Sequence, residues 1–168
     1  MKLRSFAVRA FGAAAIATAT ITGVATTASA APAPAPLVHT TINGPTLPVL
    51  GQNDYCNGLI DTAIETDPAR PGVATIALTP RGMHGVGPGW AQNPTCRVTV
   101  NIAWHLGGLA GQLVSVDLLA GEAPGATVRT DIIPGSGLAS IIVVASPSTK
   151  YGLKAQASLP VQALVLVP

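Results

Sequence analysis

The stretch "CRVTVNIAW", Cys96 to Trp104, alternates apolar and polar residues along its length. Successive side chains of an extended chain point to opposite faces, so its five even-numbered residues share one face. All five are apolar: the cysteine, two valines, an isoleucine and the tryptophan. The pattern predicts a half-buried strand in which Cys96 and Trp104 both point into a dry interior.

Other short stretches, rich in Val, Ile and Thr and separated by Gly and Pro, also favour strands. In one of them, "YGLKAQA", Leu153 and Ala155 alternate with Lys154 and Gln156, which puts the lysine and the glutamine on the polar side. The predicted strands are "LVHTTI" (37–42), "GLIDTAIE" (58–65), "VATIALT" (73–79), "QLVSVDLL" (112–119), "ATVRTDII" (126–133), "LASIIVVA" (138–145), "YGLKAQA" (151–157) and "VQALVLV" (161–167).

One of these stretches also fits a helix. In "NGLIDTAIETD", residues 57–67, Leu59 and Ala63 would suit one helical face, with Ile60 and Ile64 beside them. The strand is the preferred interpretation. The fold class is therefore all-β, an antiparallel sandwich or barrel of about seven to nine strands.

The segment "SPSTKYGLKAQA", residues 146–157, resembles the entry to strand F of immunoglobulin-like and fibronectin type III domains. Tyr151 holds the place of the corner tyrosine, and an inward Trp104 on a candidate strand C agrees with it. The resemblance implies an immunoglobulin-like β-sandwich and almost nothing about activity. This chain departs from the pattern because Cys96 begins the candidate strand C and the candidate strand F has no cysteine, which excludes the B-to-F disulfide.

The N-terminus reads as a secretory signal peptide over residues 1–30. A charged start precedes an apolar stretch, and Ala-Ser-Ala at positions 28–30 is a small-x-small cleavage site. Residues 31–48 are predicted to be a Pro/Ala-rich spacer with a possible edge strand, and residues 49–168 a single β-sandwich domain. No membrane span is expected after cleavage, and the protein is expected to be secreted or associated with the cell envelope.

Charge argues against a nucleic-acid partner. Three of the nine Lys and Arg residues lie in the signal peptide, which leaves six against seven Asp and Glu in the exported part. Binding to phosphate backbones needs clustered Lys and Arg. The exported chain does not supply such a cluster.

Both cysteines, Cys56 and Cys96, lie in the exported part. An oxidising compartment favours a disulfide between them, although two free buried thiols are the alternative. Such a bridge would close a loop of about 40 residues and stabilise the fold by about 4 kcal/mol in the chain-entropy model.

The stretch "RGMHGVGPGW", Arg81 to Trp90, lies in a long predicted connection between two strands. Connections of this length are usually functional or disordered. Met83, His84 and Trp90 offer contact area at low charge, as interface residues do. These residues are the candidate binding loop, and the preferred alternative is that Trp90 caps the end of the sandwich.

Metal binding and cofactor binding are not expected. His39, His84 and His105 are not at ligand spacing, but His105 is included in the candidate site as a neighbour that a folded-back loop would bring to His84. The glycines of residues 81–90 lack the Lys-Ser/Thr of a phosphate loop.

Catalysis is not expected either. Ser136 in "PGSG" reads as a turn residue, because the strand-elbow-helix setting of a hydrolase serine is absent. Asp54, Asp61, Glu65 and Asp67 are interpreted as a solvated acidic edge.

The sequence thus predicts an exported, non-catalytic module for binding or structure. Its partner would be an unknown extracellular protein or envelope component. The alternative is a small secreted enzyme inhibitor or hydrolase. A hydrolase would need Ser136 or an acidic residue beside a histidine, and an inhibitor would need one rigid, extended loop.

Overall fold

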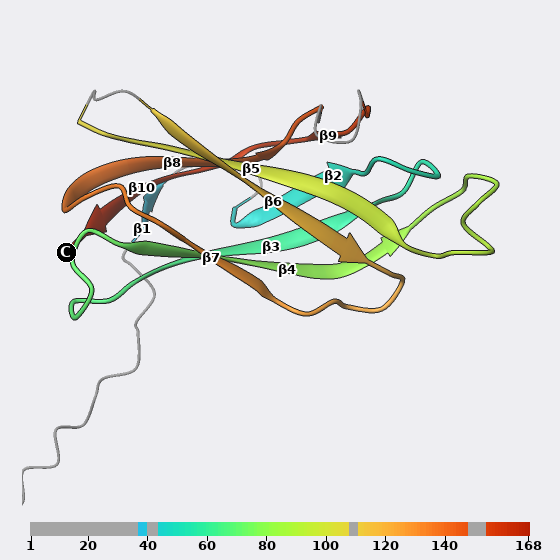
Figure 1. The fold of residues 1–168 in the computed structure, drawn as a ribbon, viewed down its shortest axis with the longest axis horizontal. Coiled ribbons are helices and arrows are strands. Elements are labelled where there is room, and N and C mark those ends of the chain that lie inside the picture. Colours follow the sequence, from blue (N-terminus) through green and yellow to red (C-terminus); the bar gives the residue numbers. More distant parts are fainter. Residues whose placement is uncertain (1–36, 40–43, 108–110, 148–153) are drawn as a thin grey trace, which may run out of the picture.

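The structure is a computed structural model, and it describes residues 37–39, 44–107, 111–147 and 154–168. Within these residues the fold is all-β, with ten strands and no helix, in two antiparallel sheets (Figure 1). No helix in the described part is long and apolar enough to cross a membrane. The predicted signal peptide and most of the predicted spacer lie outside the described residues.

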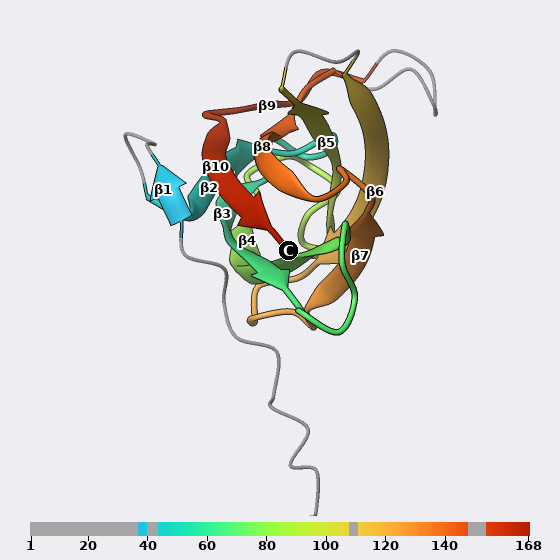
Figure 2. The same ribbon diagram turned by 90° about the vertical axis from the view of Figure 1, so that its left-hand side faces the viewer.

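Each sheet has five strands. The first sheet runs in the order β1 (Leu37–His39), β10 (Val161–Val167), β8 (Gly137–Ala145), β5 (Cys96–Leu106) and β6 (Gln112–Ala120). The second sheet runs in the order β7 (Val128–Ile132), β4 (Ala74–His84), β3 (Asn57–Thr66), β2 (Thr46–Leu50) and β9 (Ala157–Ser158). Viewed end-on, the two sheets enclose a common interior (Figure 2).

The predicted strand from Cys96 to Trp104 is confirmed as β5, which pairs with β6 on one side and β8 on the other. Its inward residues are all buried, and Trp104 is only 8% exposed. They pack with inward residues of the other strands in one core, whose largest fully buried members include Leu47, Ile60, Ile76, Leu78, Ile102, Leu118 and Ile141.

Residues 57–66 form a strand, so the helical alternative for this stretch is wrong. The stretch pairs with β2 on one side and β4 on the other. Ile60, Thr62 and Ile64 are buried at a spacing of two, whereas Leu59 and Ala63 face outward. Cross-strand pairing and burial of one strand face override the weak helical pattern.

The strand order differs from that of an immunoglobulin domain. There, the third strand crosses to the opposite sheet after two strands in the first. Here β1 lies in the first sheet, β2, β3 and β4 follow one another in the second, and β5 returns to the first. The structure therefore supports a two-layered all-β fold. Tyr151, on which much of the resemblance to immunoglobulin-like domains rests, lies outside the described residues.

Candidate binding site at the disulfide end

One end of the sandwich is closed by the predicted disulfide between Cys56 and Cys96, which the structure confirms. The bridge joins the residue before β3 to the first residue of β5, and so it ties the two sheets together. The Cα atoms of the two cysteines are 5.7 Å apart. Gly51 packs directly on the bridge, where any Cβ would overlap both sulfur atoms. This close approach explains the glycine at position 51.

The stretch from Arg81 to Trp90 is only partly a loop. Strand β4 continues to His84, with Met83 opposite Gly58 and His84 opposite Asn57 in β3. The connection expected to begin at Pro80 therefore begins at Gly85. Met83 is fully buried in the core, while His84 is exposed beside it. Of these two neighbours, only the histidine is available for surface contact.

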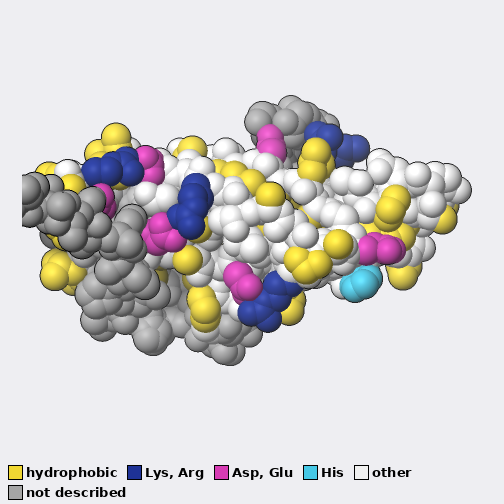
Figure 3. Space-filling view, turned by 90° about the horizontal axis from the view of Figure 1, so that it is seen from below, with side chains coloured by type: hydrophobic (Ala, Val, Ile, Leu, Met, Phe, Trp, Pro, Cys, Tyr) yellow, Lys and Arg dark blue, Asp and Glu magenta, His cyan; other side chains and the backbone are white. Residues whose placement is uncertain are grey.

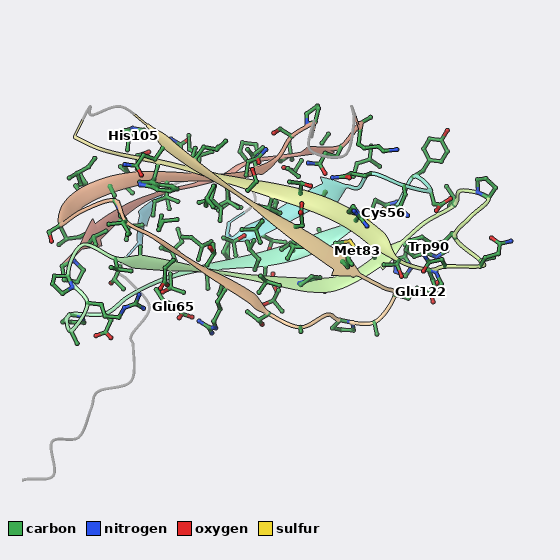
Figure 4. All side chains as sticks on the ribbon, in the orientation of Figure 1. Cys56, Glu65, Met83, Trp90, His105 and Glu122 are labelled. Atoms are coloured by element: carbon green, nitrogen blue, oxygen red, sulfur yellow. A yellow bond between two sulfur atoms is a disulfide. The ribbon has the colours of Figure 1, made fainter. Side chains whose placement is uncertain are left out.

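Trp90 also belongs to the core, with 8% of its surface exposed. Its indole Nε1 donates a hydrogen bond of 3.1 Å to Oε1 of Glu122. Gly85 lies against the ring, because a Cβ there would overlap the indole. Figure 4 shows Met83, Trp90 and Glu122 together near the bridge. Trp90 therefore fills the end of the interior and gives its one polar atom a partner.

Asp54 holds the loop after His84 through both its backbone and its side chain. Its backbone carbonyl accepts hydrogen bonds from the amides of Val86 (3.0 Å) and Gly87 (2.8 Å). Its Oδ1 accepts another, of 2.9 Å, from the amide of Gly89. A Cβ at Gly87 or Gly89 would overlap Asp54. The glycines of this stretch thus allow the loop to lie closely on Asp54.

Asp54 and Tyr55 both have positive φ angles, 51° and 49°. Asp tolerates this left-handed conformation better than most residues do. The expected solvated edge is therefore the wrong interpretation for Asp54, which is half-buried and braces a loop.

Asn53 connects the same turn to the start of β5. Its Nδ2 donates to the carbonyl of Thr95 (2.8 Å), and its Oδ1 accepts from the amide of Arg97 (3.0 Å). The amide of Gln52 donates to the carbonyl of Arg97 (2.9 Å). The turn at residues 51–56 is therefore fixed by side-chain and backbone hydrogen bonds as well as by the disulfide.

Gln156, expected on a polar strand face, is instead 3% exposed. Its Oε1 accepts from the amide of Thr99 (3.0 Å), and its Nε2 donates to the carbonyl of Thr99 (2.7 Å) and to that of Ser146. Strand β8 ends at Ala145, opposite Val100, so Thr99 lies one residue beyond the ladder. The side-chain amide of Gln156 makes the two hydrogen bonds to the backbone of Thr99 that a neighbouring strand would otherwise make.

The side chain of Gln156 is also bonded to that of Gln52. Nε2 of Gln52 donates to Oε1 of Gln156 (2.9 Å) and to Oγ1 of Thr99 (2.8 Å). Oγ1 of Thr99 in turn donates to Oδ1 of Asp117 (2.8 Å). A continuous polar network thus runs from the disulfide-bonded turn into the first sheet.

These segments surround a hollow of about 390 Å³. Its lining is mostly amide, hydroxyl and charged side chains, with a single apolar member: Gln52, Asn53, Asp54, Asn93, Thr95, Arg97, Lys154 and Leu119. We call this the disulfide-end hollow. The walls come from the 51–56 turn, the connection before β5 with the start of that strand, the end of β6 and the segment after β8.

His105 lies at the opposite end of β5 from Trp90, so the alternative in which a folded-back loop brings it to His84 is wrong (Figure 4). No group of three or more His, Cys, Asp or Glu residues able to hold a metal gathers in the described residues. Ser136 donates its hydroxyl to the carbonyl of Pro168 (2.7 Å).

The residues that shape the hollow carried weak sequence signals. The turn-forming "GQND" at positions 51–54 was the only local indication, and nothing local marked Gln156. Comparisons with protein-family models, curated proteins and solved structures found no match to this chain. A functional proposal therefore has to come from the hollow and its surroundings.

Proposed function

We propose that the protein is an exported, non-catalytic binding module of the cell exterior or envelope, and that the disulfide-end hollow takes its ligand. The disulfide is compatible with an oxidising, extracytoplasmic compartment. The charged, apolar and small-residue pattern of residues 1–30 supports export. Immunoglobulin-like sandwiches present binding loops at one end, and we propose the same use of an end despite the different strand order.

The observation that carries the proposal is the preorganisation of the hollow. The 51–56 turn and the connection before β5 are already fixed by the disulfide and by Asn53 and Asp54. A site that is ordered before binding loses little conformational entropy when a ligand arrives. The polar lining fits a hydroxyl-rich ligand, because side-chain amides both donate to and accept from hydroxyls, while the Arg and Lys side chains donate and the carboxylate accepts. We therefore propose an envelope glycan as the ligand.

The test is binding of the exported chain, residues 31–168, to soluble envelope polysaccharide, measured by calorimetry. Asn93 and Lys154 line the hollow through exposed side chains. We expect Asn93→Ala combined with Lys154→Ala to weaken binding at least about tenfold, a loss of about 1.4 kcal/mol. Gln112→Ala, at the opposite end of the molecule, is the matched control and should bind like the parent.

Two results would overturn the proposal. One is a correctly folded double variant, with its disulfide formed, that binds as tightly as the parent. The other is a parent protein that binds no envelope polysaccharide.

A second candidate function is inhibition of a secreted protease. Val86 is 84% exposed, yet its amide is held by the carbonyl of Asp54. A protease would grip an exposed apolar side chain on a rigid loop of this kind. Inhibition of an elastase-type protease by the parent, and its loss in Val86→Asp, would favour this function over glycan binding.

A further inference from the structure

The two sheets differ in what they present to solvent. On the outer face of the second sheet, acidic and basic side chains pair across strands, Arg81 with Asp61 and Arg129 with Glu65. Arg70, in the turn between β3 and β4, pairs with Asp131 on β7. Figure 3, seen from below the view of Figure 1, shows acidic and basic side chains lying next to one another. Such a face is well suited to water.

The outer face of the first sheet carries large apolar residues instead. Four exposed leucines, between 40% and 65% exposed, lie on its strands together with the half-buried Ile142. We call this set the apolar face: Leu113 on β6, Leu138 and Ile142 on β8, and Leu164 and Leu166 on β10.

The strand register brings these residues together. Leu166 lies opposite Leu138 in neighbouring strands. Ile142 and Leu113 both lie opposite Ala103, on either side of β5. The other outward positions of these strands in this region are Ala103, His105, the buried Ser140 and the exposed Gln162. No Lys, Arg, Asp or Glu occupies an outward position in this region of the described strands.

We propose that the apolar face is covered by a second copy of this chain, in a two-fold symmetric dimer. The largest exposed apolar patch on a typical monomer covers about 300–600 Å² and is often functional. An uncharged face can stack on its own copy without placing like charges together, and a charged partner would find no opposite charge there.

The size of the face sets the strength of the dimer. Four strands about 4.8 Å apart and three outward rows about 6.8 Å apart, with their side chains, cover roughly 400 Å² in projection. Standard interfaces bury about 800 Å² on each partner, and weak, transient ones bury less. The dimer is therefore of the weak class and forms reversibly as concentration rises.

Dimerisation through this face leaves both disulfide-end hollows open. The hollow lies where β5 begins and β6 ends, whereas the apolar face lies toward the opposite ends of these strands. Two open hollows in one particle would make binding to a repetitive ligand bivalent, with higher avidity and no new contact. This consequence rests on the proposed function; the dimer itself does not.

The experiment is sedimentation equilibrium of residues 31–168 over a hundredfold range of concentration. We expect the mean mass to rise toward that of a dimer. Leu138→Lys with Leu166→Lys should remain a monomer throughout, because two copies would then bury facing cations. Leu59→Lys places the same change at an exposed leucine of the second sheet and should dimerise like the parent. Disulfide content and thermal unfolding check that each variant folds.

A parent protein that stays monomeric over the whole range overturns the proposal, as does a double variant that still dimerises. In the first case, flotation of the parent with phospholipid vesicles would identify a lipid surface as the occupant. A dimer that is lost only after deletion of residues 31–36 would assign the contact to that segment and would equally overturn the proposal. Glycan binding by a monomeric double variant would show that the two proposals stand or fall separately.

Discussion

The two ends of the sandwich are held together in different ways. At the end with the hollow, the sheets are joined by a disulfide and by buried side-chain amides. At the opposite end, the last carbonyl of the chain, on Pro168, accepts from the amide of Gly72 (2.8 Å) and the hydroxyl of Ser136 (2.7 Å). An exposed ion pair between Arg70 and Asp131 lies near these turns.

This difference indicates where the molecule is rigid and where it opens first. Covalent and buried contacts between elements far apart in sequence resist local opening, whereas exposed turn contacts contribute little. The end with the hollow should therefore be the last to unfold, as the proposed binding function requires. Changes at the two ends test this comparison.

The largest effect is expected from removing the disulfide. Cys56→Ala with Cys96→Ala releases a loop closed across 40 residues. The chain-entropy model predicts a loss of about 4 kcal/mol in the free energy of unfolding. Urea denaturation of both proteins measures it. A loss below about 1 kcal/mol, the size of one ordinary hydrogen bond, would mean that the bridge does not dominate this end.

Truncation of Gln156 should come next. Gln156→Ala leaves the backbone N–H and C=O of Thr99 and the carbonyl of Ser146 without their partner in a buried place. We expect a loss of about 2 to 3 kcal/mol, since buried polar groups without partners are costly. Gln156→Glu keeps the shape but removes the donor, so it should also destabilise. Urea midpoints equal to the parent's in both variants would contradict the strand-like role of this amide.

A smaller, local effect is expected at Asp54. Asp54→Ala removes the acceptor for the amide of Gly89, and Asp54→Asn retains an oxygen at that place. We expect about 1 kcal/mol of destabilisation for the alanine variant and less for asparagine. Hydrogen exchange at the Gly89 amide should accelerate in Asp54→Ala alone. Equal acceleration in both variants would show that the carboxylate charge matters more than the hydrogen bond.

The smallest effect is expected from acid at the opposite end. The hydrogen bond from Arg70, with a second from Thr75, holds the pKa of Asp131 below its ordinary value. The pKa of Asp61 is lowered in the same way by Arg81. Because the folded pKa lies below the unfolded one, this stability is present above about pH 4 and is lost as the pH falls through the folded pKa.

Thermal unfolding of the parent and of Asp131→Asn between neutral pH and about pH 2 would measure this acid dependence. The variant should lose slightly less stability on acidification, because exposed pairs contribute little. Identical curves would mean that the ion pair adds nothing, and a large difference would contradict the comparison of the two ends.

The sequence predicted the features that depend on local pattern. The period of two marked β5 and most of the other strands, and two cysteines in an exported chain allowed one bridge. The same pattern failed at Gln156, whose partner Thr99 is 57 residues away. Hydrogen bonds between residues so far apart produce no periodic pattern in the amino-acid sequence.

The candidate site was predicted only in part for the same reason. The glycine-rich stretch near Trp90 is unusual in composition, but the reason for Gly87 and Gly89 is their close contact with Asp54, which lies 35 residues before Gly89. The burial of Met83 follows from β4 continuing past Pro80, since its neighbour β3 extends far enough to pair with it. Register with a distant strand, rather than the composition of the loop, decides which of these side chains reaches the surface.

The short pairing of β1 with β10 has a mechanical consequence. Leu37 lies opposite Val165 and His39 opposite Ala163, so the start of β1 and the end of β10 lie at the same end of the sheet. Tension applied between these two points would unzip the three residue pairs one after another, at low force, instead of shearing them together. Under load β1 would therefore detach before the longer β10–β8 ladder and the disulfide-linked body are pulled apart.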